Sequence, residues 1–443
     1  MKSARHIPHI LILVALLVPL AVHSEKFWQA RGSGWDLSAI RLEPPSAPIP
    51  RELFAVNLLR FPGNHRLPGD YVGAWRTFDA VWSKVEPTRG QWAFAKVDAD
   101  VADATQRGVD IDLILGTSPT WASARPEEPG YKWQPLGIRA EAASLADWTN
   151  YVQTVATRYK GRVHTYEMWN EPNLSGGYSG DIEHLVSLCR AAYHTIKMVD
   201  PTITVISPGF SPYSNPGSPP DSSQAYIAKF LSLGGKDTFD VLGYHFYTEA
   251  GNPERAVTLK GRIDKIFRAN YSTLPPKVWN TESGYPIENG PQAQRNTFKT
   301  YNLPMHLLTG RESQAFIVRS FVLAWAMGVQ RFYWYCWGHE QYAPADDFGD
   351  TDKPATEALR NLSNRLTGSR MLSCTRTSGG LWSAYLQRES GESFWIVWSD
   401  SSPQRLEGPA ARNATHARYI DGSEVPRTAG MTVGGDPVFL DEE

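Results

Sequence analysis

Residues 166–173 read Tyr-Glu-Met-Trp-Asn-Glu-Pro-Asn, and small residues follow at 175–177. Apolar positions lead up to a polar, turn-forming tip, a pattern that is typical of a short buried strand ending in a loop. Proline disfavours a helical backbone at the residue before it, so we expect Glu171 to be extended at the end of this strand. Asn170 adds an amide, which offers both a donor and an acceptor, beside that carboxylate.

Residues 277–284, Lys-Val-Trp-Asn-Thr-Glu-Ser-Gly, have the same form and place Glu282 at a second strand end. A glycosidase needs two such carboxylic acids, because one protonates the leaving oxygen while the other attacks the anomeric carbon or activates water. The alternative is that each Glu is a surface acid in a loop. A lone Glu would favour that alternative, whereas the pair favours a catalytic site.

Strand and helix signals alternate along the middle of the chain. Eight strand–helix repeats predict an α/β fold, a (β/α)8 TIM barrel over residues 25–367, with an irregular lead-in up to about residue 50. Glu171 then ends strand four and Glu282 ends strand seven, on the side of the barrel where this fold carries its sites. From 368 to 443 short strands predict a small all-β sandwich module. The expected strands are 54–59, 77–81, 110–115, one ending at Glu171, 204–207, 241–247, 278–282 and 331–337, and the expected helices are 94–107, 145–159 with Ser144 as N-cap, 181–200, 224–233, 255–269, 314–327 and 355–366.

The composition narrows the class of protein. The 443 residues carry 44 Lys and Arg against 46 Asp and Glu, so the chain has no basic field for nucleic acid. The three cysteines, Cys189, Cys336 and Cys374, are too few and too far apart for a disulfide framework or a zinc site. We expect buried thiols, although one pair could bridge, and we expect no metal and no cofactor.

The N-terminus resembles a targeting segment. Lys2 and Arg5 precede an apolar run over residues 10–22, and Ser24 supplies a small residue for cleavage. This pattern predicts a secretory signal peptide over residues 1–24, or an uncleaved inner-membrane anchor. In either case we expect the protein to be exported and periplasmic, and the second alternative would hold it at the inner membrane.

With these motifs in place, the chain resembles glycoside hydrolase family 39, in a clan of retaining (β/α)8-barrel enzymes. The resemblance is carried by Asn170-Glu171-Pro172, by Glu282, and by residues 82–90, 243–247 and 437–440. It implies a two-carboxylate double displacement and covers nearly the whole chain after the N-terminal segment. Within the family, the chain is most similar to members encoded with bacterial exopolysaccharide machinery. That similarity implies an endoglycosidase that acts on a mannose-rich exopolysaccharide in the biofilm matrix, with the export machinery as a partner.

The resemblance also implies roles for other residues. Asn170 would bond the sugar 2-hydroxyl, His245 would line the site, and the Tyr247 hydroxyl would hold the nucleophile. Because that hydroxyl favours a charged Glu282, Glu171 would be the acid/base and Glu282 the nucleophile. Three tryptophans near strand ends are candidate stacking platforms, each with core packing as the alternative: Trp121, Trp334 and Trp337.

Some residues and some alternatives stay open. We expect Glu167 to form an ion pair inside the barrel, and Trp82 and Glu86 to hold the loop after strand two. Arg76 and Asn57 are undecided as ligand contacts. The Ser- and Pro-rich stretch 208–221 suggests an open groove and internal cleavage. Two competing hypotheses remain: a transglycosidase with the same two Glu residues, and a non-catalytic polysaccharide-binding or assembly subunit.

Overall fold

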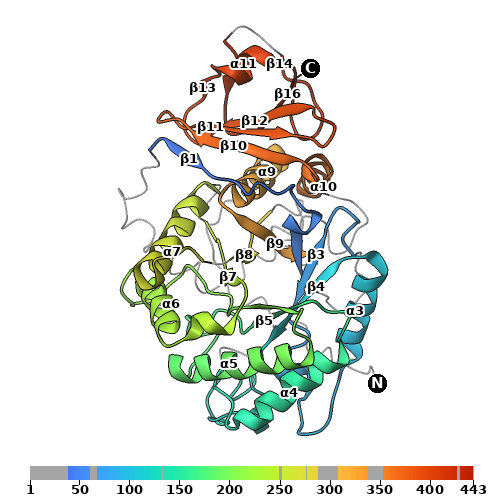
Figure 1. The fold of residues 1–443 in the computed structure, drawn as a ribbon, viewed down its shortest axis with the longest axis vertical. Coiled ribbons are helices and arrows are strands. Elements are labelled where there is room, and N and C mark those ends of the chain that lie inside the picture. Colours follow the sequence, from blue (N-terminus) through green and yellow to red (C-terminus); the bar gives the residue numbers. More distant parts are fainter. Residues whose placement is uncertain are drawn as a thin grey trace, which may run out of the picture.

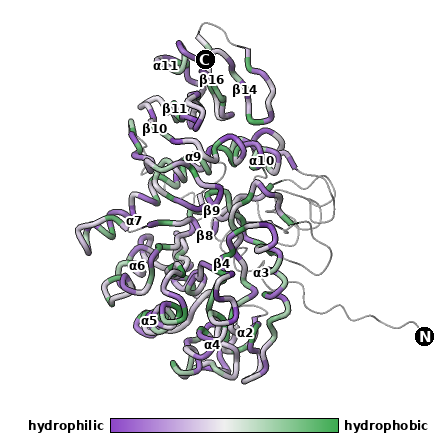
Figure 2. The backbone as a smooth tube through the Cα atoms, turned by 45° about the vertical axis from the view of Figure 1, so that its right-hand side comes forward, coloured by the Kyte–Doolittle hydropathy of each residue, from purple (hydrophilic) through white to green (hydrophobic). Residues whose placement is uncertain are grey.

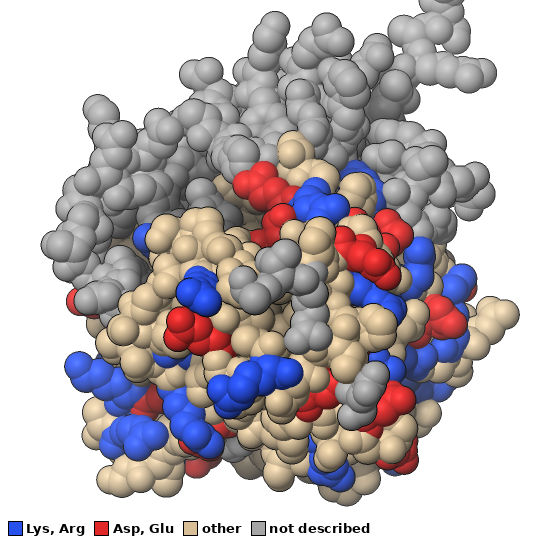
Figure 3. Space-filling view, turned by 90° about the horizontal axis from the view of Figure 1, so that it is seen from above, with Lys and Arg blue, Asp and Glu red and all other residues tan. Residues whose placement is uncertain are grey.

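The computed structural model describes residues 38–59, 67–130, 134–248, 252–275, 277–287, 308–337, 353–426 and 430–442, and the statements below concern these residues. The predicted signal peptide or anchor lies outside them. Within the described ranges, the helices are too short or too polar to cross a bilayer. On the face drawn in Figure 3, basic and acidic side chains lie among one another.

Eight parallel strands form the barrel, which confirms the predicted fold (Figure 1). The strands follow one another around the sheet in chain order, and a parallel bridge between Ile206 and Val241 joins the last open pair, β6 and β7. The strands are β2 (Phe54–Leu58), β3 (Ala74–Thr77), β4 (Asp110–Leu115), β5 (Thr165–Met168), β6 (Thr204–Ile206), β7 (Leu242–Tyr244), β8 (Val278–Ser283) and β9 (Val329–Trp337).

The helices surround this barrel and turn their apolar residues toward it, so hydrophobic and hydrophilic residues alternate along them in Figure 2. Ser144 accepts a hydrogen bond from the Asp147 N–H, as predicted for an N-cap. Gly108 ends α3 in a left-handed conformation, with φ of 60°. The helices are α2 (Trp82–Val85), α3 (Ala95–Arg107), α4 (Leu145–Arg158), α5 (Ile182–Val199), α6 (Ser222–Ser232), α7 (Arg255–Tyr271), α9 (Gly310–Ala326) and α10 (Pro354–Leu366).

Two layers of side chains fill the part of the barrel that positions the site. One cluster of buried residues, called here the apolar layer, consists of Ala55, Ala74, Ile206, Val241, Trp279 and Tyr333. Two residues further along β2, β3 and β8 lie Asn57, Arg76 and Thr281, and these three form a second set, called here the polar layer, together with Asp112 on β4 and Glu167 on β5. All of the polar layer is buried. A polar layer inside a barrel is unusual, because branched apolar residues dominate most barrel interiors.

The C-terminal part forms a separate antiparallel sheet with strand order β1-β10-β11-β12-β16-β14, beside a two-stranded sheet of β13 and β15. Residues 25–50 were expected to be an irregular lead-in, yet residues 40–42 form β1 and pair with β10. Such a pairing joins residues more than 300 positions apart, so no local pattern announces it. The elements are β1 (Ile40–Leu42), β10 (Arg370–Arg376), β11 (Leu381–Gln387), β12 (Ser393–Ser399), β13 (Gln404–Arg405), α11 (Pro409–Asn413), β14 (Ala414–Arg418), β15 (Thr432–Val433) and β16 (Val438–Glu442).

Hydrogen bonds and cation–π contacts attach the C-terminal sheet to the barrel. The Trp398 indole donates to Glu254, at 2.7 Å, and Arg319 on α9 makes two hydrogen bonds to the same carboxylate. Arg365 on α10 lies 4.9 Å from the ring centres of both Phe394 and Phe439. These contacts attach the second sheet to α9 and α10, the two helices drawn beneath it in Figure 1.

Two local predictions need correction, and one about cysteines holds. The second strand was expected over residues 77–81 but lies at Ala74–Thr77, and residues 82–85 form α2 where a long turn was expected. The apolar run at 78–81 belongs to the loop above the strand, where burial at the barrel mouth produces the same pattern as a strand. The three cysteines are buried free thiols.

Candidate active site

Glu171 reaches the barrel mouth through a strained turn. The chain leaves β5 with Trp169 at φ of 57° and Glu171 at φ of 46°, so the expectation of an extended Glu171 was wrong. Proline restricts the right-handed helical region at Glu171, and the residue takes the left-handed region instead. Hydrogen bonds from the Glu171 N–H to Gly209, and from the Leu174 N–H to Glu171, hold this turn. Such a conformation costs about 1–3 kcal/mol and persists only where the surroundings enforce it.

Glu282 is aimed by a bulge in β8. Asn280 is paired with Phe332 and Ser283 with Trp334, so β8 has one residue more than β9 in this interval. A bulge of this kind lets two consecutive side chains escape the usual alternation. The Thr281 hydroxyl and the Glu167 carboxyl both lie close to Gly209, and the Glu282 carboxyl contacts Arg76. Thr281 and Glu282 therefore both face the barrel interior, although they are consecutive in the strand.

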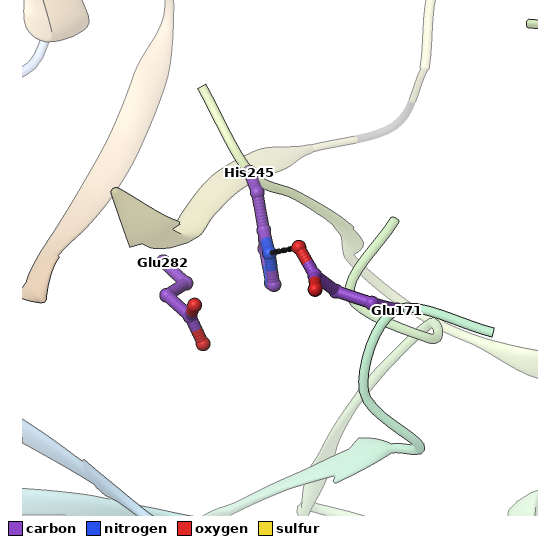
Figure 4. Close-up of side chains that lie close together, drawn as sticks. All are labelled: Glu171, His245 and Glu282. Carbon is purple, nitrogen blue, oxygen red and sulfur yellow. Dashed lines mark hydrogen bonds and ion pairs between the residues drawn. The ribbon is translucent and has the colours of Figure 1, made fainter. Parts of the chain in front are cut away.

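The two carboxyl groups converge on one point. One oxygen of Glu171, one oxygen of Glu282 and a ring nitrogen of His245 all lie within 4.8 Å of one another. Figure 4 shows His245 between the two carboxyl groups, which approach from the turn after β5 and from β8. Each Glu is only 2% exposed. The structure thus brings together the two residues that the sequence singled out.

Glu282 is held by two donors. The Tyr247 hydroxyl donates to one carboxylate oxygen and Arg76 to the other, both at 2.9 Å. Burial raises the pKa of Glu282, and Glu171 adds to that rise, while His245, Arg76 and the Tyr247 hydrogen bond lower the pKa. Like charges this close do not both ionise readily, so the two carboxyls titrate as a pair. The donors around Glu282 bond its charged form and therefore favour ionisation at that site.

Glu171 has a different environment. Its carboxyl contacts His245 Nδ1 at 2.9 Å. Burial raises the pKa of Glu171 to about 7, against smaller lowering effects from Ser211 and Arg76. Burial also lowers the pKa of His245 to about 4, so the imidazole is neutral near pH 7 and offers no cation to Glu171. Glu171 is therefore the member of the pair that is suited to hold a proton.

Arg76 connects the polar layer to the catalytic pair. It makes two hydrogen bonds to Glu167, at 2.7 and 2.8 Å, and one to Glu282. Its remaining bonds go to the side-chain oxygens of Asn57, at 2.7 Å, and Asn170, at 2.8 Å. The predicted internal ion pair of Glu167 is thus confirmed. Because Arg76 takes the Asn170 amide oxygen, the amide N–H groups are the part of Asn170 that a ligand can use.

The sequence left Arg76 and Asn57 undecided, and the structure makes both part of the network around Glu282. The available signal was a charged residue at an inward position of a buried strand, where charge occurs only with partners. Tyr213 was also missed. It follows β6 and stacks on Tyr247 with ring centres 6.2 Å apart.

Asn173 joins the two loops beside the acid/base candidate. Its amide donates to the carbonyls of Ser211 and Tyr213 and to the Ser223 hydroxyl, and its oxygen accepts from the Ser211 N–H. This residue ends the motif around Glu171, yet no role was assigned to it from the sequence. Its position explains how the loop after β5 is fixed to the loop after β6.

The candidate stacking tryptophans differ in where the structure places their rings. Trp334 is fully buried, with its ring against Phe316 and Phe332, so the stacking prediction for it was wrong. Side chains alternate along β9, and Trp334 faces α9 while Tyr333 faces the barrel interior. Trp337, at the end of β9, is also buried, and its stacking role stays a prediction.

Trp121 lies in a supporting network at the barrel mouth. Arg89 sits 4.4 Å from its ring centre, Trp82 packs on it edge-on, and its indole N–H donates to the Glu86 carbonyl. The Glu86 carboxylate accepts from the Trp82 indole and from the Gly90 N–H, which confirms that Trp82 and Glu86 hold this loop. These contacts leave Trp121 partly buried, and a role in stacking stays a prediction.

The same three central residues are also a potential cation site. Glu171, His245 and Glu282 have donor types that bind divalent metals, and they form the one such group in the described part of the chain. In the structure, Glu282 is bonded by Arg76 and Tyr247, and His245 by Glu171. A positively charged neighbour opposes a cation here, and the expectation that the protein needs no metal or cofactor stays a prediction.

Comparison with known sequences gives short matches. No family model matches the chain. The chain is 28% identical over 98 residues to an endo-1,4-beta-xylanase of Agaricus bisporus, which is 22% of this chain and 27% of that protein. It is 27% identical over 124 residues to endo-1,4-beta-xylanase A of Phanerodontia chrysosporium, which is 27% of this chain and 28% of that protein. The chain therefore matches little more than a quarter of the length of either xylanase.

Comparison with solved structures gives matches over nearly the whole chain. A family 39 glycoside hydrolase of Bacteroides cellulosilyticus WH2 has a TM-score of 0.62 at 18% identity, over 90% of this chain and 82% of that one. A family 39 beta-xylosidase of Caulobacter crescentus has a TM-score of 0.56 at 15% identity, over 90% and 98%. The catalytic domain of a family 30 xylanase of Talaromyces cellulolyticus has a TM-score of 0.52 at 14% identity, over 84% and 86%. The chain shares their fold, a barrel with an attached β-domain.

Proposed function

We propose that this protein is a retaining glycoside hydrolase related to family 39, with Glu171 as acid/base and Glu282 as nucleophile. The observation that carries the proposal is the separation of the two carboxyl groups, whose nearest ligand atoms lie within 4.8 Å. Retaining glycosidases hold their carboxyls about 5–5.5 Å apart, while inverting ones need about 6.5–9.5 Å to admit a water. The family 39 neighbours and the two xylanases support a glycosidase on this fold.

The reaction then has two steps. Glu282 attacks the anomeric carbon, the glycosidic C–O bond breaks, and the Glu171 proton passes to the leaving oxygen. In the second step Glu171 takes a proton from water, and the resulting hydroxyl displaces Glu282 with a second inversion, so the anomeric configuration is retained. Glu171 must be protonated at the start and Glu282 ionised, which is the distribution that Arg76 and Tyr247 favour.

We also propose an exported endoglycosidase that cleaves a mannose-rich exopolysaccharide. The support is the resemblance of the chain to PslG, the glycosidase encoded with the Psl exopolysaccharide machinery, and the naming of both curated relatives as endo-acting enzymes. In this proposal the N-terminal segment directs the protein to the periplasm or holds it at the inner membrane. The polysaccharide is the substrate, and the export machinery is the partner.

The test of the two-carboxylate mechanism uses an aryl glycoside with an activated leaving group and azide as an external nucleophile. Glu171→Ala should still form the glycosyl-enzyme, stall there, and recover with azide to a product of retained configuration. Glu282→Ala should lose the first step, and azide should give the inverted product. Glu183→Ala, the same change at an exposed site on α5, is the matched control. Exchange of the two stereochemical outcomes would reverse the roles, and unchanged turnover in both variants would refute the mechanism.

The substrate proposal needs a separate experiment. Purified protein is incubated with a mannose-rich exopolysaccharide and, in parallel, with xylan, and the products are sized by chromatography. Internal cleavage should give a falling series of oligosaccharides from the exopolysaccharide. Release of monosaccharide alone contradicts endo action, and cleavage of xylan alone contradicts the proposed substrate while leaving the mechanism intact.

A further inference from the structure

The barrel interior holds more acids than it can ionise. Four carboxyl groups surround Arg76. Glu167 and Glu282 accept hydrogen bonds from it. Its positive charge also lowers the pKa of Asp112 and of Glu171. Among the described residues that form these contacts, Arg76 is the one guanidinium that faces all four. Ionising every acid would leave surplus negative charge in a desolvated site, and buried charges persist only when they are paired.

Asp112 differs from the other three acids in its contacts. It is fully buried, and neither of its carboxyl oxygens has a hydrogen-bond donor among the described residues. Glu167 and Glu282 each accept from Arg76, and Glu171 contacts His245. A carboxylate that is buried without a single donor is one of the most costly groups a protein interior can contain.

The strand register pairs Asp112 on β4 with Thr165 on β5, and Glu167 lies two residues further along β5. Asp112 on β4 is paired with Arg76 on β3, and Ile114, two residues further, is paired with Glu167 on β5. Glu167 faces the barrel interior, where Arg76 bonds it, and a hydrogen bond with the Glu167 side chain is among the causes that raise the pKa of Asp112. Two carboxyl groups can share a hydrogen bond only when one of them carries a proton.

We propose that Asp112 is a neutral carboxylic acid at working pH, that it donates its proton as a hydrogen bond to Glu167, and that it thereby acts as a positioning residue for Arg76. The consequence for catalysis rests on the proposed function. Glu167 receives two N–H groups from Arg76 and one O–H from Asp112, so the ion pair is satisfied without drawing Arg76 further toward β4 and β5. Arg76 then keeps its contact with Glu282.

The charges around Asp112 agree with this state. Burial raises the pKa of Asp112 well above its usual range, the Glu167 charge and hydrogen bond add to the rise, and Arg76 and Arg331 oppose it. Arg331 is already engaged by Asp110 at 2.6 Å. The titratable and charged groups that face Asp112 are Arg76 on β3, Glu167 on β5, and Arg331 and Tyr333 on β9.

The first test is spectroscopic and needs no substrate. Infrared difference spectra of the full-length protein should show the carbonyl stretch of a protonated carboxylic acid that shifts in D2O, persists across neutral pH and disappears in Asp112→Asn. The signal of Glu171 is the internal reference, because it should fade as the pH rises through about 7 and vanish in Glu171→Gln. Identical spectra for the wild-type protein and Asp112→Asn above pH 8 would overturn the proposal.

The second test separates positioning from packing through the pH profile of kcat/KM. Asp112→Asn exchanges one neutral donor for another, so neither limb of the profile should move. If Asp112 were ionised, the same change would remove a negative charge and shift both limbs to lower pH, which would overturn the proposal. Asp112→Leu lacks the donor, so we expect kcat to fall about tenfold and the acid limb to move to higher pH as Arg76 leaves Glu282. Should the protein cleave no glycoside at all, the proposed function fails, and the infrared experiment still decides the state of Asp112.

Discussion

The apolar and polar layers of the barrel lie next to each other but contribute differently. The apolar layer, which includes Ala55 and Tyr333, is stabilised by burial and close packing. In the polar layer, the Arg76 fork is matched by oxygens of Glu167, Asn57, Asn170 and Glu282. Such a network stabilises little in total, because desolvation offsets most of the attraction, although loss of one partner is severe. The comparison shows that the apolar layer stabilises the barrel, whereas the polar layer positions the catalytic pair.

Removal of Arg76 should be the most damaging change. Arg76→Met keeps an unbranched apolar stem but removes the guanidinium, so Glu167 and Glu282 are buried without their cation, which should lower the free energy of unfolding by about 3–5 kcal/mol at pH 7. The carboxyls would then take up protons in the folded state, so the loss should shrink as the pH falls toward 5. Urea unfolding at several pH values measures this dependence. A loss that is the same at pH 5 and pH 8 would mean that Arg76 acts by packing alone.

The contrast between these layers also shows what the sequence could predict. The number and order of barrel strands follow from local signals, namely apolar runs punctuated by Gly, Pro and caps such as Ser144. The strand-end positions of Glu171 and Glu282 follow from the same signals. Each depends on residues that are close in the chain, so a single sequence contains the information.

The parts that the sequence did not predict depend on pairing between distant segments. An internal ion pair was predicted for Glu167, but its partner Arg76 lies 91 positions away, and the bond from Arg76 to Glu282 spans 206 positions. The bulge in β8 is visible only against β9. The inward or outward direction of Trp334 likewise depends on the register of β9 in the closed barrel. The left-handed turn at Glu171 is set by Gly209 from the neighbouring loop. In each case tertiary contacts override a local preference.

Neutralising the acid/base should stabilise the protein, which separates function from folding at one residue. Burial raises the pKa of Glu171 from 4.5 to about 7. The folded protein therefore keeps a proton that the unfolded chain releases above about pH 4.5, and stability falls as the pH rises from there through 7. Glu171→Gln removes this loss and should gain roughly 3 kcal/mol at pH 8, with little gain at pH 4. Thermal unfolding against pH tests this, with Glu183→Gln as the exposed control; equal stability of the Gln variant and the wild type at pH 8 would place the proton elsewhere.

The smallest effect should come from the apolar layer. Ile206 is fully buried, and its side chain faces the other members of that layer. Ile206→Val deletes one methyl group, so the free energy of unfolding should fall by about 0.5–1.5 kcal/mol. No charge in the folded state changes, so the loss should be equal at pH 5 and pH 8, and kcat/KM should keep the position of both pH limbs. Urea unfolding at the two pH values and the rate profile together decide this. A pH-dependent loss, or a displaced limb, would mean that the apolar layer also fixes the position of Arg76 relative to Glu282. A shift of Arg76 is the route by which loss of a methyl group could alter the ionisation of the catalytic pair.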